Sequence, residues 1–88
     1  MGPAARWSLV VDAHPEPDAL LRVVNAFVVL GAEIAEAAMT REGDGYTLRI
    51  DAHGLTTERA ETLLRRIKAL PVVRRAGLGW RAAQAEAA

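Results

Sequence analysis

The sequence predicts an α+β fold in which two amphipathic helices alternate with four short strands. Three observations carry this prediction. Two segments repeat apolar residues at helical spacing, four segments alternate apolar and polar residues, and a glycine-rich turn joins the middle two of those four. The order β-α-β-β-α-β with right-handed crossovers is that of the ferredoxin-like sandwich. We therefore expect a four-stranded antiparallel sheet of order 4-1-3-2, with both helices on one face.

The amino-acid composition excludes several classes of function. The chain has 88 residues, 51% hydrophobic and 25% charged, which is typical of one globular domain. Eleven basic and eleven acidic side chains cancel, so no overall field that gathers nucleic acid or anionic membrane is expected. The absence of cysteine excludes disulfides and Cys-based zinc sites. With no signal-peptide pattern and no long apolar run, we expect a soluble, cytoplasmic protein that needs no cofactor.

The first strand is expected over residues 7–13, "WSLVVDA", where side chains alternate. Behind it, Pro17 suits the first turn of a helix, because its missing N–H costs nothing there. Asp18 puts a negative charge at the positive end of the helix dipole. Apolar residues then recur at helical spacing as far as Gly31, which supplies the stop. The predicted helix covers residues 17–30.

Residues 33–41, "EIAEAAMTR", are assigned to a strand against their local preference, since most of them are helix formers. Gly31 ends the preceding helix, and residues 43–45, Gly-Asp-Gly, supply a hairpin turn. The residues from Tyr46 to Ala52 alternate as a strand should. Because a hairpin needs a strand before its turn, the segment ahead of the turn is predicted to be β.

The second half of the chain completes the pattern. Thr56 or Thr57 can cap a second amphipathic helix. Pro71 ends that helix, and residues 72–80 form the last strand. We expect an N-terminal lead over 1–6, one domain over 7–80 and a flexible C-terminal tail over 81–88.

His14 and His53 are the only histidines and are candidates for a metal site or an acid–base pair. Each lies at the carboxyl end of its strand, and strands one and three run antiparallel in the predicted fold. The two imidazoles should therefore lie at opposite edges of the sheet. We favour two surface histidines over a shared site.

Acidic residues gather near the first turn. Asp12, Glu16 and Asp18 could hold a cation or act as paired carboxylates. No oxygen-ligand loop spacing follows them, however, and a helix start attracts acids in any case. No nucleophile–base pair is found elsewhere, so the sequence indicates a protein that is not an enzyme and holds no metal.

The most basic stretch is a candidate for RNA binding. In this fold RNA binding needs aromatic side chains on the central strands, where the chain offers only Trp7 and Tyr46. A solvated face is therefore favoured. The stretch consists of Arg65, Arg66, Lys68, Arg74 and Arg75.

The segment "PDALLRVVNAFVVLGAEI" resembles the start of the ACT domain, the small regulatory module of amino-acid metabolism. That family opens its first helix with P-G-x-L-x-R-[IV] and closes it with G-x-x-[IV]. The later segment "LLRRIKALPVVRRAGL" is similar to the family's L-x-K-L-x-x-V-x-x-V. Within the family the chain looks most like the short small subunit of acetolactate synthase (acetohydroxyacid synthase). The matching residues are Pro17, Leu20, Arg22, Val23, Gly31 and Ile34 in the first segment, and Leu64, Ile67, Leu70 and Val73 in the second.

The resemblance implies a non-catalytic regulatory subunit that activates the catalytic large subunit of acetolactate synthase in branched-chain amino-acid biosynthesis. The thiamine-diphosphate-dependent carboligation would belong to that partner. One alternative is a stand-alone ACT-type amino-acid sensor that regulates another enzyme. A less favoured alternative is an acylphosphatase-like small hydrolase, because the first turn lacks that family's glycine-rich phosphate cradle.

ACT domains commonly pair side by side into an eight-stranded sheet, and this chain is suited to such pairing. Strand two should be an edge strand. Residues 33–40 include several small side chains and contain neither Lys nor Pro, the residues that commonly prevent an edge from pairing with another chain. We predict a homodimer through this edge. The edge residues are Ile34, Glu36, Ala38 and Met39.

The resemblance also implies an amino-acid effector site near the first turn. In the family, the glycine after the proline lets the backbone approach the effector carboxylate; here that position is Asp18. Glu33 replaces the Asn that often begins strand two. Two acids oppose a carboxylate, so we expect weak or absent sensitivity to valine. The candidate effector residues are Pro17, Asp18, Ala19, Leu20, Glu33 and Ile34.

Overall fold

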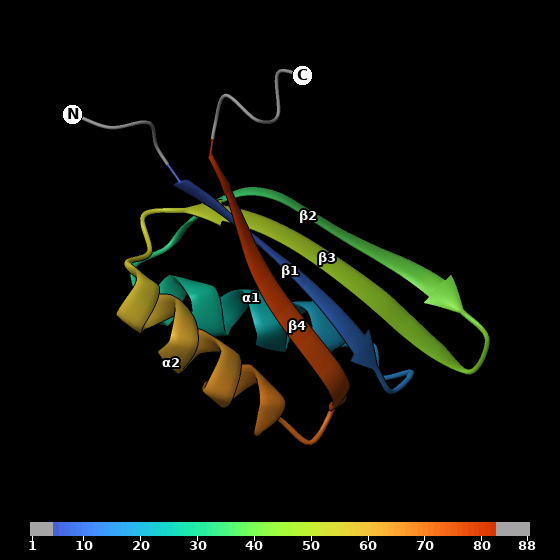
Figure 1. The fold of residues 1–88 in the computed structure, drawn as a ribbon. Coiled ribbons are helices and arrows are strands. Elements are labelled where there is room, and N and C mark those ends of the chain that lie inside the picture. The colour runs from blue at the N-terminus through green and yellow to red at the C-terminus, as the bar shows by residue number, and fades with distance from the viewer. Residues whose placement is uncertain (1–4, 83–88) are drawn as a thin grey trace.

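A computed structural model describes residues 5–82 and confirms the predicted fold (Figure 1). The sheet order is β2-β3-β1-β4, which is the predicted order read from its other end, and all neighbours are antiparallel. Both helices cover one face of the sheet (Figure 1). Most of the expected lead and tail lies outside the described residues. The elements are β1 (Ala5–Ala13), α1 (Ala19–Val29), β2 (Glu33–Glu42), β3 (Gly45–His53), α2 (Thr57–Lys68) and β4 (Val73–Ala82).

β2 is a strand although its residues favour a helix, as predicted. It pairs with β3 from Glu33 opposite His53 to Glu42 opposite Gly45. Gly31 has a positive φ of 81°, which breaks the preceding helix. The backbone hydrogen bonds of the hairpin therefore override local helix propensity. A register shift between Ile34 and Glu36 marks a bulge near the start of the strand.

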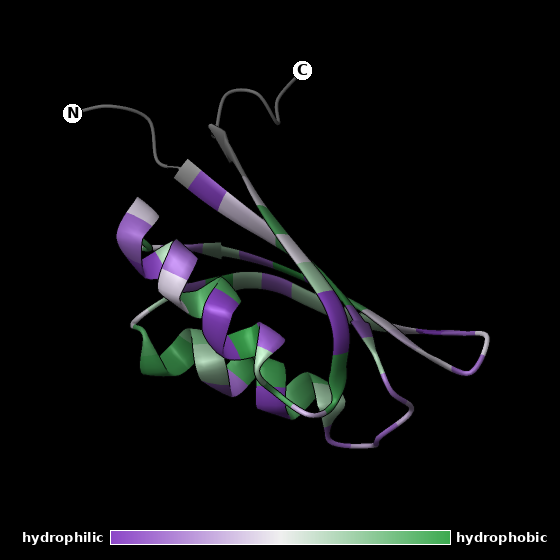
Figure 2. Cartoon of the chain, turned by 60° about the horizontal axis from the view of Figure 1, so that its bottom comes forward, coloured by the Kyte–Doolittle hydropathy of each residue, from purple (hydrophilic) through white to green (hydrophobic). Residues whose placement is uncertain are grey.

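The core lies between the helices and the inner face of the sheet. Leu9 of β1 pairs with Ile50 of β3, and both are fully buried. Val10, the next residue of β1, faces the open side of the sheet and is 50% exposed. This is the alternation expected of a sheet covered on one side. In Figure 2 hydrophobic colour runs along most of α1, whereas hydrophilic and hydrophobic colours alternate along α2. The largest fully buried side chains are Phe27, Leu9, Leu48, Ile50, Leu63, Ile67, Val11 and Val23.

Side-chain bonds to the backbone fix the loops at one end of the sheet. Thr56 caps α2 by accepting a hydrogen bond from the Arg59 backbone N–H at 3.1 Å, one of the two caps expected. Arg59 Nη1 donates in turn to the Leu30 carbonyl, 3.2 Å away, at the end of α1. Trp7 Nε1 donates to the Leu55 carbonyl at 3.0 Å within the protein interior. α2 is thus tied both to α1 and to β1.

A pair of glycine substitutions tests the packing at the other end of the sheet. A Cβ at buried Gly45 would collide with the Ala13 carbonyl oxygen and lie 3.2 Å from Arg74 Nη1, whereas a Cβ at Gly77 would meet nothing within 4 Å. Gly45→Ala should therefore lower the free energy of unfolding by about 1–3 kcal/mol. Gly77→Ala is the matched control and should leave it unchanged or raise it by up to about 1 kcal/mol. Urea unfolding of both variants gives the comparison, and equal effects would contradict this packing.

Candidate functional site

The first turn carries a salt bridge rather than a capping carboxylate. Asp18 is the N-cap residue of α1, but its side chain makes no capping hydrogen bond. Instead Arg22 Nε donates to the Asp18 carboxylate at 2.7 Å. This bond is the main cause that lowers the pKa of Asp18 below its ordinary value. The negative charge predicted at the helix start is therefore partly compensated by Arg22, a pairing signalled by the four-residue spacing on a helix.

The candidate effector residues fall into two groups at opposite ends of α1. Residues 17–20 form the start of the helix, while Glu33 and Ile34 begin β2 after the helix has ended. Figure 1 shows these two points at opposite ends of the helix. The 11 residues of α1 separate them by about 16 Å, at 1.5 Å per residue. One chain therefore does not bring the two groups into a single binding site.

Arg74 joins three chain segments near the first turn. Its Nε donates to His14 Nδ1, and its Nη1 donates to an Asp44 carboxylate oxygen, each at 3.1 Å. The hydrogen bond from Arg74 is the main cause that lowers the pKa of Asp44. The β1–α1 turn, the β2–β3 hairpin and the start of β4 are thereby connected. Sequence reasoning placed Arg74 on a solvated face and missed both partners, because residues so distant in sequence carry no local signal.

The structure also places the histidines and the acidic residues of the first turn, for which a shared site was considered and not favoured. His14 follows the end of β1, and His53 is the last residue of β3. Because these strands are antiparallel, the two histidines lie at opposite ends of the sheet and form no shared site, as expected. Asp12 accepts a bond from Arg75 Nη2 at 2.6 Å, so the acidic residues of the first turn do not converge on a cation. Within residues 5–82 no group of three or more His, Asp or Glu side chains is placed to hold a metal ion.

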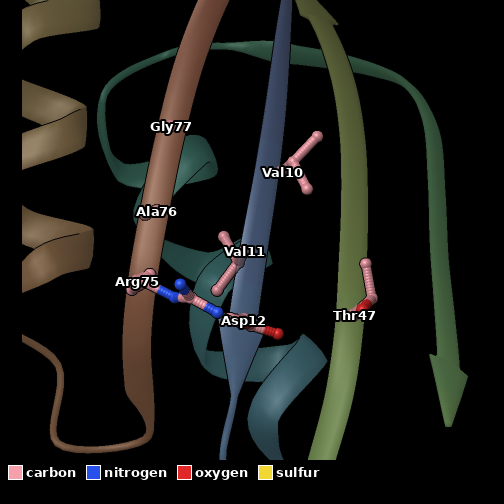
Figure 3. Close-up of a pocket in the computed structure, with 7 residues that line it drawn as sticks. All are labelled: Val10, Val11, Asp12, Thr47, Arg75, Ala76 and Gly77. Carbon is pink, nitrogen blue, oxygen red and sulfur yellow. Dashed lines mark hydrogen bonds and ion pairs between the residues drawn. The ribbon is translucent and has the colours of Figure 1, made fainter. Parts of the chain in front are cut away.

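A shallow groove lies on the open face of the sheet, opposite the helices. Its volume is about 320 Å³. Figure 3 shows Val10 of β1 and Thr47 of β3 beside the Asp12–Arg75 pair, with Gly77 of β4 leaving the strand bare. The open face of three strands and one ion pair provide no enclosed apolar cavity for an effector. The lining residues are Val10, Val11, Asp12, Thr47, Arg75, Ala76 and Gly77.

A nearly buried carboxylate anchors another part of the open face. Asp51 is 3% exposed and accepts a hydrogen bond from Ser8 Oγ at 2.6 Å. Arg6 Nη2 lies 3.4 Å from the same carboxylate. Removing one partner of such a pair would leave an uncompensated buried charge, which is strongly destabilising. Sequence reasoning did not predict that Asp51 is buried and paired. The alternation of β3 places its side chain on the open face but gives no sign of these contacts.

The predicted dimer edge is exposed along its length. β2 ends the sheet, and Glu36 and Ala38 lie on its open face, across from Asp51 and Arg49. Ile34 and Met39 lie on the helix-covered face, and Met39 is 39% exposed. α1 packs on the β2 side of the sheet. It adds exposed apolar side chains at Leu21, Val28 and Val29.

Comparisons with known proteins support the fold. No protein-family model and no curated protein matches the sequence. Among solved structures, the ACT domain from GTP pyrophosphokinase of Chlorobium tepidum superposes with a TM-score of 0.73 and 8% identity, covering 86% of this chain and 99% of that domain. A homoserine dehydrogenase from Thiobacillus denitrificans gives 0.73 at 13% identity, covering 90% of this chain but 17% of the enzyme. The C-terminal domain of the MgtC protein from Mycobacterium tuberculosis gives 0.63 at 20% identity, covering 92% and 88%.

At these identities the likeness shows a shared fold, that of the ACT domain in the first case. The resemblance seen in the motifs around Pro17 and Gly31 is thus matched by the architecture. Neither described helix has the length and apolarity that crossing a membrane requires.

The Asp18–Arg22 pair can be tested by titration. The pKa of the Asp18 carboxyl should lie below its ordinary value of 3.8 and return to it in Arg22→Ala. Because the folded pKa is the lower one, the stabilisation is fully present above the ordinary value and is lost as pH falls through the folded pKa. Carbon NMR of the Asp18 carboxyl group measures this pKa in the unmodified chain and in Arg22→Ala. Arg66→Ala on α2 is the control and should change nothing; an identical Asp18 titration in both variants would contradict the pairing.

Proposed function

We propose that this chain is a non-catalytic regulatory module of the ACT type that acts on a partner enzyme as a homodimer. The observation that carries the proposal is the exposed edge of β2, with small side chains and the apolar flank of α1 beside it. An unpaired edge of this kind is a template for a second strand. Pairing of two copies through β2 would give a continuous eight-stranded sheet with all helices on one side.

A dimer of this kind would complete a site that one chain leaves divided. A two-fold axis normal to the sheet sets the two β2 strands antiparallel, so the start of one lies beside the end of the other. In each chain, the end of β2 lies at the same end of the sheet as the start of α1 (Figure 1). Residues 17–20 of one subunit would then approach Glu33 and Ile34 of the partner subunit. Two such sites would form per dimer.

Side-chain size favours this pairing, whereas charge does not assist it. The register shift between Ile34 and Glu36 puts Glu33 on the open face, opposite His53, whereas Arg41 lies on the helix-covered face, opposite Tyr46. Glu33 and Arg41 would therefore not pair on one face across a two-fold axis at Ala37. The small Ala37 side chain would permit close approach of the two strands at the axis.

For the partner, we favour the catalytic subunit of acetolactate synthase, on the resemblance of the first-helix motif to its small subunit. Glu33 would add an uncompensated negative charge to each site, so weak or absent valine sensitivity and a structural, activating role are favoured. The pairing of Asp18 with Arg22 reduces the repulsion at the other half of the site. That pairing favours the second candidate, a stand-alone amino-acid sensor that regulates another enzyme.

Charge removal at the proposed site distinguishes these two functions. Asp18→Gly combined with Glu33→Asn should increase the affinity for branched-chain amino acids by about a hundredfold, because a few kcal/mol of repulsion near a surface is relieved. Calorimetric titration of valine, leucine and isoleucine measures the change. Glu36→Asn, an exposed acid three residues further along β2, is the matched control. Tight binding by the unmodified chain would favour the sensor, and unchanged binding by the double variant would show that charge does not close the site.

Association with the enzyme tests the proposed partner. A tagged form of the full chain should co-purify with the acetolactate synthase catalytic subunit of its own organism and raise the rate of carboligation. The catalytic subunit of another thiamine-diphosphate enzyme is the control and should do neither. If the acetolactate synthase subunit shows neither association nor stimulation, this assignment is wrong, whatever the outcome of the amino-acid titration.

A further inference from the structure

The strand at the other end of the sheet presents a second unpaired edge. Among the described residues β4 pairs only with β1, so its outer backbone groups have no strand partner there. No proline interrupts it, and beyond Arg75 the open face of the strand has glycine at positions 77 and 79. A Cβ at either glycine would meet nothing within 4 Å. An incoming strand could therefore lie flat along this edge without steric conflict.

Cations border this edge where β4 begins. A cleft of about 420 Å³ separates the end of α2 from the start of the strand, with Lys68 on one side and Arg74 and Arg75 on the other. Val73 and Ala76 supply its apolar lining. The Arg75 side chain is 83% exposed although it bonds Asp12. Arg65 and Arg66, both exposed in the last turn of α2, add to the positive charge.

The opposite edge of the same sheet is acidic, with Glu33, Glu36 and Glu42 exposed along β2. Although the net charge of the chain is zero, the β2 edge is negatively charged and the start of the β4 edge is positively charged. The positive potential around β4 is local, and it selects a negatively charged partner of limited extent rather than a long polyanion. The outer backbone groups of β4 and the neighbouring Lys68 and Arg75 side chains are together suited to bind an extended strand that carries carboxylates.

We propose that β4 binds an extended acidic segment of a partner protein by strand addition. Backbone hydrogen bonds to β4 would supply affinity, carboxylates on the segment would contact Lys68 and Arg75, and an apolar side chain would enter the cleft between them. This site is independent of the partner enzyme assigned above. Pairing through β2 would leave one such edge at each end of an eight-stranded sheet.

A peptide probe tests this proposal on the full chain. A fluorescent peptide of about nine residues that alternates glutamate and valine should bind, and its affinity should fall as salt is added. Amide chemical-shift changes should concentrate on residues 73–79. Lys68→Glu should weaken binding by about tenfold or more. Arg41→Glu, the same charge change on the β2 edge, should leave it within about twofold.

Arg75→Gln provides a second variant. Glutamine is chosen because a glutamate at this position would repel Asp12, the bonding partner of Arg75. This variant should also weaken binding, and circular dichroism confirms that each variant is folded. Equal binding of a lysine–valine peptide, binding of neither peptide, or shift changes centred on β2 would each overturn the proposal. A further outcome would also overturn it: the unmodified chain forms oligomers larger than a dimer, and Lys68→Glu dissociates them. That result would identify the acidic β2 edge of a second copy as the occupant of the β4 edge.

Discussion

The backbone of β2 is the constraint on which the rest of the structure depends. Its residues favour a helix by intrinsic propensity, and they are held as a strand by the ladder to β3 and the turn that joins the two strands. That ladder uses one side of the strand. The same pairing that creates the sheet therefore leaves its outer side without a partner within residues 5–82, next to an apolar helix that is itself partly uncovered.

The division of the effector residues follows from this topology. A right-handed crossover from β1 through α1 to β2 puts the first turn and the start of β2 at opposite ends of the helix. No side-chain movement can close a gap of that length. In the proposed dimer, a second copy in antiparallel register would close this gap by symmetry, so effector binding would depend on dimerisation. The Asp18–Arg22 pair then decides how much negative charge such a site presents.

Sequence reasoning predicted the element order, the sheet order and the strand assignment of residues 33–41, because period, turn residues and hairpin logic are local. It placed His14 and His53 correctly for the same reason, since antiparallel strands fix which ends meet. It did not predict that Arg74 would bond His14 and Asp44, or that Asp51 would be buried with Ser8. These contacts join residues 30 to 60 positions apart, and their geometry depends on how the sheet twists and where its loops close.

The central claim is that β2 joins two copies of the chain. Sedimentation equilibrium of the full chain at a concentration on the order of 10 µM tests it most directly, because an obligate pair depends on protomer concentration. The account predicts the mass of a dimer, with dissociation on dilution. A monomer at that concentration would contradict the shared site and, with it, the proposed mode of regulation.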